Sequence, residues 1–232
     1  MFLKKFLRLI FLLKEKRFKE IWIYFIYLWG LLRIKKALIL GNQQIKSRYG
    51  VLLSMNPNDK TFKFCVSGSY GNFYSERLKN YKSKFLFLDI GANQGIYTLC
   101  SSKNPFNIKS YAFEPVPQTF ELLKKNVDIN NLSHKCKLYN KALFEKKGYE
   151  QMEVIDNHSG AASIFKNNPN SCTRNIVQIE TISHLELNKI IGNENIPILI
   201  KIDTEGSESK IIKLIKKSFF MHRVTEIFYE ID

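Results

Sequence analysis

An apolar run that ends in an acid and enters a glycine loop is the strongest chemical signal in this sequence. The segment FLFLDIGANQG places Asp89, Gly91, Asn93 and Gly95 within seven residues, at the expected entry to a helix. Glycine lets the backbone turn sharply and approach a ligand, and the free N–H groups at a helix start would face that ligand. Because Asn93 replaces a glycine of the dinucleotide pattern G-x-G-x-x-G, the loop argues against NAD and favours a ligand without a pyrophosphate.

A second acid stands at the end of the next apolar run, KSYAFEP. Glu114 lies 19 residues after Gly95, and a carboxylate at this strand end can accept both hydroxyl groups of a ribose. Pro117 suits the first turn of the following helix, where its missing N–H has no intrahelical partner to lose. Asp89 could lie close to the ammonium group of a ligand. Together with Glu114, the loop therefore predicts a ligand that joins a nucleoside to an amino-acid moiety. S-adenosylmethionine has this chemistry.

Three further residues are candidates for methyl transfer, which requires a dry pocket, an aligned acceptor and removal of the acceptor's proton. Asp203 ends the apolar run PILIKID and is the first candidate for the base, with helix capping as its alternative role. Glu205 could instead complement a helix dipole. His158, in DNHSGAAS, could act as a base near neutral pH or be a solvated loop residue. These groups could gather around a metal ion only if the segment near His158 folds back, so we predict no metal site.

The elements that must position these residues alternate between strand and helix signals from residue 85 onward. We expect strands at 85–90, 109–114, 136–143, 197–203 and 224–232, and helices from about Gln94, over 117–130 and from about Ser207. Such alternation predicts an α/β fold with a doubly wound, mostly parallel sheet of the Rossmann-like kind. A polar insertion is expected at about 145–180.

The chain before residue 85 differs in character from the main domain. We predict a basic amphipathic helical arm over 1–48, a small strand and helix lead-in over 49–84, and the main domain over 85–232. In the lead-in, YGVLLSMNPNDKTFKFCV indicates two short strands around a turn at 56–59. The four cysteines form no C-x-x-C pair, so we expect reduced thiols in a cytoplasmic protein.

Positive charge is concentrated in the arm. The chain has a net charge of +15, and residues 1–40 hold ten Lys or Arg against two Glu, which is more than half of the excess. Residues 1–20 resemble a signal peptide, but no small-residue cleavage site follows them. The next apolar stretch, over 21–32, is shorter than the roughly 20 residues that cross a bilayer. We therefore expect residues 1–40 either to lie on the inner face of the membrane or to pack on the domain or a partner.

Five segments, taken in order, resemble the FkbM-type methyltransferases, which are class I S-adenosylmethionine-dependent enzymes. They are LDIGANQGIYTL, AFEPVPQTFELLKKN, NKAL, SGAAS and IKIDTEGSE, within a match from about Phe85 to Asp232. The resemblance implies that Asp89, Gly91 and Gly95 bind the methionine portion, that Glu114 binds the ribose, and that Asn140 to Ala142 lie near the adenine. It also implies an O-methyltransferase that acts on a sugar hydroxyl of a cell-surface glycan or natural product.

One departure from this family leaves alternatives open. Class I methyltransferases normally end with two further strands, whereas this sequence stops at the fifth strand, which we expect to lie on an exposed edge where a second subunit could pair. The chain could then be a truncated, inactive module that docks on a membrane or a glycan-assembly complex. RNA methylation also fits the charge, but the basic residues cluster in an apolar, aromatic arm, which argues against nucleic acid as the partner.

Overall fold

A parallel five-stranded sheet forms the centre of the computed structural model, which describes residues 18–163 and 174–229. Its strand order is β11-β10-β3-β4-β5, and every neighbouring pair is parallel. The strands are β3 (Phe85–Ile90), β4 (Asn107–Phe113), β5 (Cys136–Tyr139), β10 (Ile198–Ile202) and β11 (Val224–Tyr229). The predicted α/β fold with a mostly parallel sheet is confirmed.

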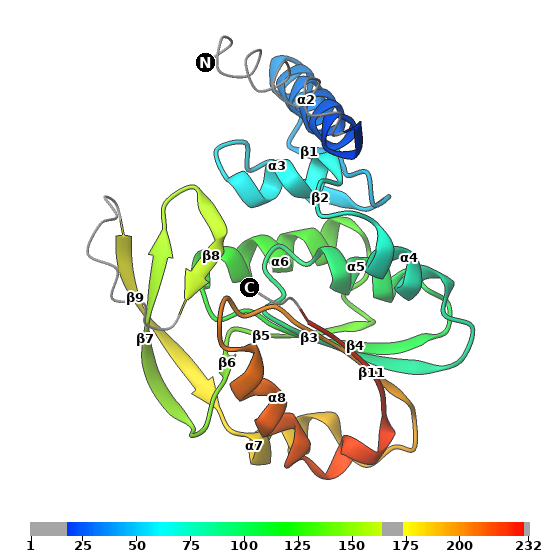
Figure 1. Ribbon diagram of the computed structural model, residues 1–232, viewed down its shortest axis with the longest axis vertical. Coiled ribbons are helices and arrows are strands. Elements are labelled where there is room, and N and C mark those ends of the chain that lie inside the picture. Colours follow the sequence, from blue (N-terminus) through cyan, green and yellow to red (C-terminus); the bar gives the residue numbers. More distant parts are fainter. Residues whose placement is uncertain (1–17, 164–173, 230–232) are drawn as a thin grey trace.

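Helices cover both faces of this sheet (Figure 1). On one side lie α4 (Phe73–Asn80), α5 (Ile96–Ser102) and α6 (Pro117–Ile129), and on the other lie α7 (His184–Ile191), α8 (Glu208–Lys216) and the short 3-10 helix η1 (Phe219–Arg223). Each layer contributes to its own hydrophobic cluster. All residues of β3 and β10 are buried, because a central parallel strand has helices against both faces. This burial explains why these two strands read as apolar runs, interrupted only by Asp89 in β3 and Lys201 in β10.

The polar insertion folds into a second sheet beside the first. Its strands are β6 (Ala142–Leu143), β7 (Gly148–Ile155), β8 (His158–Ser163) and β9 (Arg174–Ile182), in the order β6-β9-β7-β8. The prediction of one strand over 136–143 is therefore wrong, because the chain leaves the central sheet after Tyr139 and pairs Ala142 with Thr181 of β9. This step brings the second sheet to the carboxyl edge of the first.

A hairpin joins the predicted arm to the lead-in, and two helices follow it. Strand β1 (Gln44–Lys46), at the end of the arm, pairs antiparallel with β2 (Leu52–Ser54) of the lead-in, and helix α3 (Lys60–Ser67) comes next. The prediction of a strand after the turn at 56–59 is wrong. Asp59 caps the helix by accepting a hydrogen bond from the N–H of Phe62 at 2.7 Å. The buried residues Thr61, Phe62, Cys65 and Val66 recur at helical spacing, so α3 packs through one face.

The arm contains the helix α2 (Phe18–Ile39), which projects from the end of the molecule and packs on α3 (Figure 1). The first 17 residues of the predicted arm lie outside the described residues. None of the described helices is both long and apolar enough to cross a membrane. The boundaries at residues 48 and 84 stay predictions.

Candidate functional site

A cavity of about 380 Å³ opens at the carboxyl ends of the central strands. This volume falls within the range of roughly 300–1,000 Å³ that is usual for small-molecule sites, and the sheet edge is where open α/β folds bind ligands. Its lining comes from the loop after β3, the end of β4, the segment after β10, the second sheet and the lead-in. The predicted residues Gly91, Asn93, Glu114, Asp203 and Glu205 all line it.

The loop after β3 leaves no room for side chains at its two glycines. Gly91 has φ +75, and a Cβ there would lie 1.9 Å from the carbonyl oxygen of Asp203. Gly95 has φ +89, and its Cβ would lie 2.4 Å from Cδ1 of Leu123. Asn93, between them, also has a positive φ of 50, a conformation that asparagine tolerates better than most residues. The glycines therefore allow the loop to pack against the next strand end on one side and α6 on the other.

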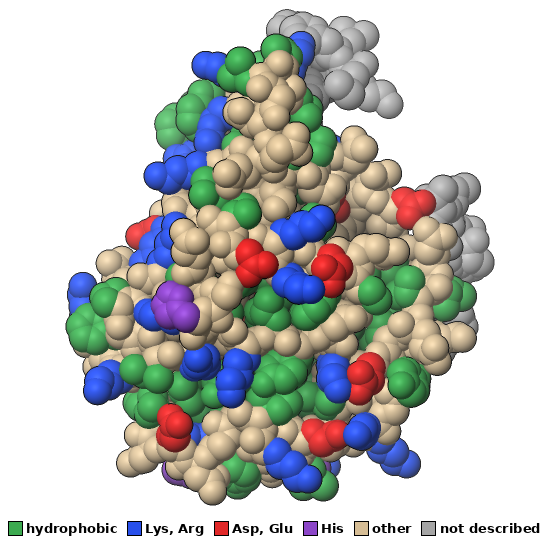
Figure 2. All heavy atoms as spheres, turned by 180° about the vertical axis from the view of Figure 1, so that it is seen from behind, with side chains coloured by type: hydrophobic (Ala, Val, Ile, Leu, Met, Phe, Trp, Pro, Cys, Tyr) green, Lys and Arg blue, Asp and Glu red, His purple; other side chains and the backbone are tan. Residues whose placement is uncertain are grey.

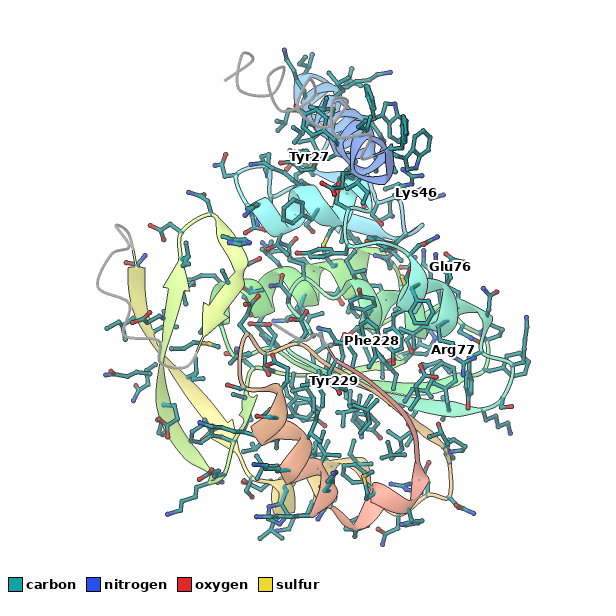
Figure 3. All side chains as sticks on the ribbon, viewed as in Figure 1. Tyr27, Lys46, Glu76, Arg77, Phe228 and Tyr229 are labelled. Carbon is teal, nitrogen blue, oxygen red and sulfur yellow. The ribbon has the colours of Figure 1, made fainter. Side chains whose placement is uncertain are left out.

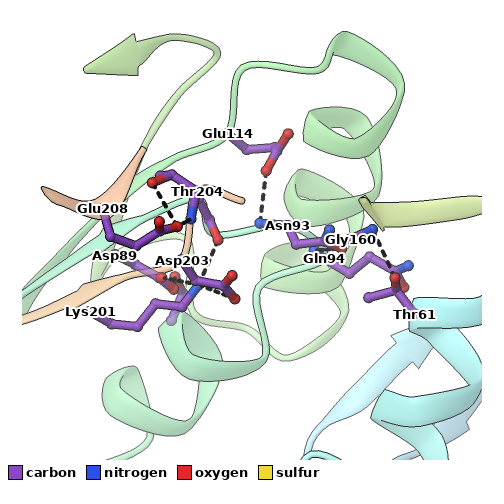
Figure 4. A network of polar contacts seen from close by, with 12 residues as sticks. Thr61, Asp89, Asn93, Gln94, Glu114, Gly160, Lys201, Asp203, Thr204 and Glu208 are labelled. Carbon is purple, nitrogen blue, oxygen red and sulfur yellow. Dashed lines mark hydrogen bonds and ion pairs between the residues drawn. The ribbon is translucent and has the colours of Figure 1, made fainter. Parts of the chain in front are cut away.

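Glu114 is buried at the edge of the cavity. One carboxylate oxygen accepts the N–H of Val116 at 3.0 Å and the other accepts the N–H of Asn93 at 2.9 Å (Figure 4). Burial raises the pKa of Glu114 to about 7, although both hydrogen bonds oppose the shift. Asn140 does not line the cavity. Its side chain donates to the carbonyl oxygens of Glu114 and Pro115 at 2.9 and 3.0 Å and so fixes this turn.

Asp89 is fully buried and lies beneath the cavity, not in its lining. Its carboxylate accepts a hydrogen bond from the hydroxyl of Thr98 at 2.5 Å and lies 3.5 Å from the ammonium nitrogen of Lys201. Within the described residues, the carboxylate of Asp89 thus contacts a protein ammonium group, and its contact with a ligand's ammonium group stays a prediction. Ala142, predicted near the adenine, does line the cavity.

Lys201 is the residue of the site that the sequence analysis missed. Its buried ammonium nitrogen donates to the carbonyl oxygen of Gly91 at 2.6 Å, and it lies 3.2 Å from the carboxylate of Asp203 (Figure 4). Burial lowers the pKa of Lys201, but the carboxylates of Asp203 and Asp89 outweigh burial and hold the pKa above its ordinary value. The signal was present as a lone lysine inside the apolar run PILIKID.

The turn after β10 presents Asp203 and Glu205 to the cavity. Glu208 holds the turn, because its carboxylate accepts the N–H groups of Thr204 at 2.8 Å and Gly206 at 3.2 Å. Ser207, not Asp203, occupies the cap position of α8, so the helix-capping alternative for Asp203 is wrong. Glu205 has φ +47, which is uncommon for a residue other than glycine or asparagine and recurs at functional sites.

His158 stands apart from these residues. It begins β8 opposite Ile155, and its neighbours Ser159 and Gly160 line the cavity while His158 does not. Burial and the charge of Lys60 lower the pKa of His158. Within the described residues, no three His, Cys, Asp or Glu side chains gather in a way that could hold a metal ion.

The lead-in forms a further wall of the cavity through Thr61, Cys65 and Tyr70, and the buried Asp59 ties this wall to the rest of the site. Its carboxylate caps α3 and also accepts hydrogen bonds from the side-chain amide of Gln94 and from the N–H of Ser159, both at 2.7 Å. A second link joins the hydroxyl of Thr61 to the N–H of Gly160 at 2.9 Å (Figure 4). One buried acid thus ties the lead-in, the loop after β3 and the second sheet together.

The protein-family model that matches this chain is the methyltransferase FkbM domain, over residues 89–232. The match includes all cavity-lining residues except Thr61, Cys65 and Tyr70. A curated relative, Methyltransferase 1 of Beauveria bassiana, is 23% identical over 146 residues, which cover 54% of this chain and 56% of that protein. The chain therefore spans just over half the length of this relative.

Two solved structures are among those to which the chain is similar. Methyltransferase FkbM from Methylobacillus flagellatus is 17% identical, with a TM-score of 0.43 over 66% of this chain and 36% of that chain. The TrmK protein of M. capricolum, solved with S-adenosylhomocysteine, is 14% identical, with a TM-score of 0.38 over 67% of this chain and 50% of that chain.

Proposed function

The chain belongs to the FkbM domain family of S-adenosylmethionine-dependent methyltransferases, and on that premise we propose that it methylates a hydroxyl group of a sugar. The observation that carries this proposal is the position of Asp203. Its carboxylate lines the same cavity as the loop after β3 and lies 3.2 Å from the ammonium nitrogen of Lys201. A hydroxyl acceptor needs a group that removes its proton, and we assign this role to Asp203 because its carboxylate lines the cavity.

The residues of the cavity fit the cofactor. Gly91 lines the cavity without a side chain, so its backbone can lie against the methionine portion, whereas Gly95 packs on α6 and does not line the cavity. The buried carboxylate of Glu114 keeps lone pairs for the ribose hydroxyls, since each oxygen accepts one backbone N–H. Ala142 offers a small apolar surface for the adenine. S-adenosylmethionine, when bound, supplies an electrophilic methyl group on its sulfonium.

The chain's own residues would prepare the acceptor. The carboxylate of Asp203 accepts the hydroxyl proton, and Lys201, which stays charged, fixes the position of that carboxylate. Cys65 and Tyr70 from the lead-in and Tyr97 from α5 close the cavity walls, so that water is kept from the reacting atoms. Asp89 neutralises part of the Lys201 charge from below, which makes Asp89 a positioning residue.

The lining of the cavity supports a sugar as the acceptor. Tyr97, Phe228 and Tyr229 provide aromatic surface for the C–H face of a sugar ring, while Glu205 and Lys210 provide polar groups for its hydroxyls. Phe228 and Tyr229 stand at the end of β11, near the middle of the molecule (Figure 3). Phe228 stacks on the ring of Tyr74 at 4.2 Å between centroids, so this aromatic surface is held in place.

A transfer assay tests the proposal. The full chain is incubated with methyl-labelled S-adenosylmethionine and, in parallel, with a panel of sugars, nucleotide sugars and RNA. We expect label in a sugar and a loss of transfer of at least about a hundredfold in Asp203→Asn, with unchanged binding of S-adenosylhomocysteine. The matched control is Asp156→Asn. The carboxylate of Asp156 accepts a hydrogen bond from the side-chain amide of Asn175, and Asp156 does not line the cavity. Label in RNA alone, or full activity of Asp203→Asn, would overturn the proposal.

A further inference from the structure

One face of α2 carries a continuous stripe of exposed apolar side chains. Phe18, Trp22, Phe25, Trp29 and Leu32 follow one another at intervals of four and three residues, which places them along one side of the helix. Their exposed fractions are 69%, 64%, 50%, 56% and 65%. Large apolar groups that gather in this way on a surface mark an interaction site.

The stripe does not hold the arm to the domain, because the opposite side of α2 does so. Gly30 meets α3 so closely that a Cβ there would lie 2.5 Å from Cβ of Ser67. Tyr27 points toward α3 and its ring lies 5.6 Å from that of Phe64 (Figure 3). Ile34 is buried in the same contact region. The exposed stripe is therefore available to a partner, as judged from the described residues.

Cations accompany the stripe. Lys36 follows Leu32 by four residues and so lies on the same side of the helix as the stripe. The guanidinium of Arg33 lies 5.0 Å from the ring centroid of Trp29. Arg33 also donates to the carbonyl oxygen of Lys46, which fixes it beside the stripe. Hydrophobic and basic side chains share the surface of this helix at the top of Figure 2. A second copy of the chain would bring cations against cations here, whereas an anionic surface complements them.

We propose that α2 docks the protein on an anionic lipid bilayer, with the stripe from Phe18 to Leu32 lying in the interface. Tryptophan is enriched at headgroup depth, and basic residues beside an apolar helix face favour anionic lipids. The helix does not meet the requirements for crossing the membrane, so it lies along the surface. This inference is independent of the acceptor and of the activity.

The two tryptophans of the chain, Trp22 and Trp29, make the stripe directly visible. The full chain is mixed with vesicles of phosphatidylcholine alone or with phosphatidylglycerol added. We expect binding to the anionic vesicles, a blue shift of tryptophan emission, quenching by lipids brominated on their acyl chains, and weaker binding as salt is raised. Emission that is unaffected by brominated lipids would overturn the proposal.

Two variants separate the stripe from the rest of the chain. In Phe25→Glu combined with Leu32→Glu, vesicle binding should fall at least about tenfold, since two exposed apolar side chains that would enter the bilayer are lost. Tyr149→Glu is the matched control, on β7 with an exposed fraction of 69%, and should bind like wild type. The proposal is overturned if the double variant binds vesicles as well as wild type. It is also overturned if wild type forms a dimer in ultracentrifugation and the double variant does not.

Discussion

Glu114 should make the folding stability depend on pH in a direction opposite to that of an ordinary paired carboxylate. Its pKa is raised to about 7 from the usual 4.5 because the side chain is buried. The folded state therefore holds a proton that the unfolded state releases, and stability is lost as pH rises from about 4.5 to about 7. The full shift corresponds to roughly 3 kcal/mol.

The perturbation that isolates this group is Glu114→Gln, compared with wild type by urea unfolding at pH 5 and pH 8. From pH 5 to pH 8, the free energy of unfolding of wild type should fall by about 2 to 3 kcal/mol more than that of the variant. Gln has its own cost, since its NH₂ cannot accept from the N–H of Val116 or Asn93. That cost does not vary with pH and cancels in the comparison.

The control for this experiment is Glu121→Gln, a change on α6 at a side chain that is 58% exposed. Its pH dependence should follow that of wild type. If the free energy of unfolding changes equally with pH in wild type and in Glu114→Gln, the assigned pKa shift is wrong, because ionising Glu114 would then not destabilise the folded protein. A steeper loss in the Gln variant would contradict the assigned direction of the pKa shift.

The remaining predictions concern the contacts that build the site. Gly91→Ala should destabilise the fold and abolish binding of S-adenosylhomocysteine in calorimetry, because φ is +75 and the new Cβ would lie 1.9 Å from a carbonyl oxygen. Lys201→Met should lower the free energy of unfolding by about 3–5 kcal/mol in urea, because buried Asp89 loses its cation; an unchanged midpoint would contradict this. Asp59→Ala should cost about 1 kcal/mol as a lost helix cap and also weaken cofactor binding, since the cavity-lining Gln94 loses one of its two side-chain acceptors; Asn72→Ala, where the cap side chain makes no hydrogen bond, is the control.

The central sheet and the loop after β3 could be predicted because their signals are local. An apolar run five or six residues long that ends in an acid and a glycine specifies a buried strand and the turn after it. Glu114 and Asp203 both line the cavity for the same reason, since carboxyl ends of parallel strands share one edge of a sheet, while their roles stay predictions. The resemblance to the FkbM family implied the same residues at this edge of the sheet and, in addition, Ala142.

The rest of the site depends on contacts between distant segments. Asp59 reaches Ser159 across 100 residues, and Lys201 reaches the carbonyl of Gly91 across 110 residues. Neither pairing has a local signature. The error over α3 has a different cause, because the aromatic and β-branched residues of TFKFCV favour a strand in isolation, while the Asp59 cap and one-sided packing favour the helix. His158 lies beside the cavity lining, because the strand that carries it presents the following residues inward.

The most direct test of the account is a calorimetric titration of the full chain with S-adenosylmethionine and S-adenosylhomocysteine, because it requires no knowledge of the acceptor. We predict one site that binds both compounds in wild type and in Asp203→Asn, and a loss of binding in Glu114→Ala, which removes the carboxylate for the ribose. Well-folded wild type that binds neither compound, or Glu114→Ala that binds as tightly as wild type, would contradict the assignment of this cavity to the cofactor.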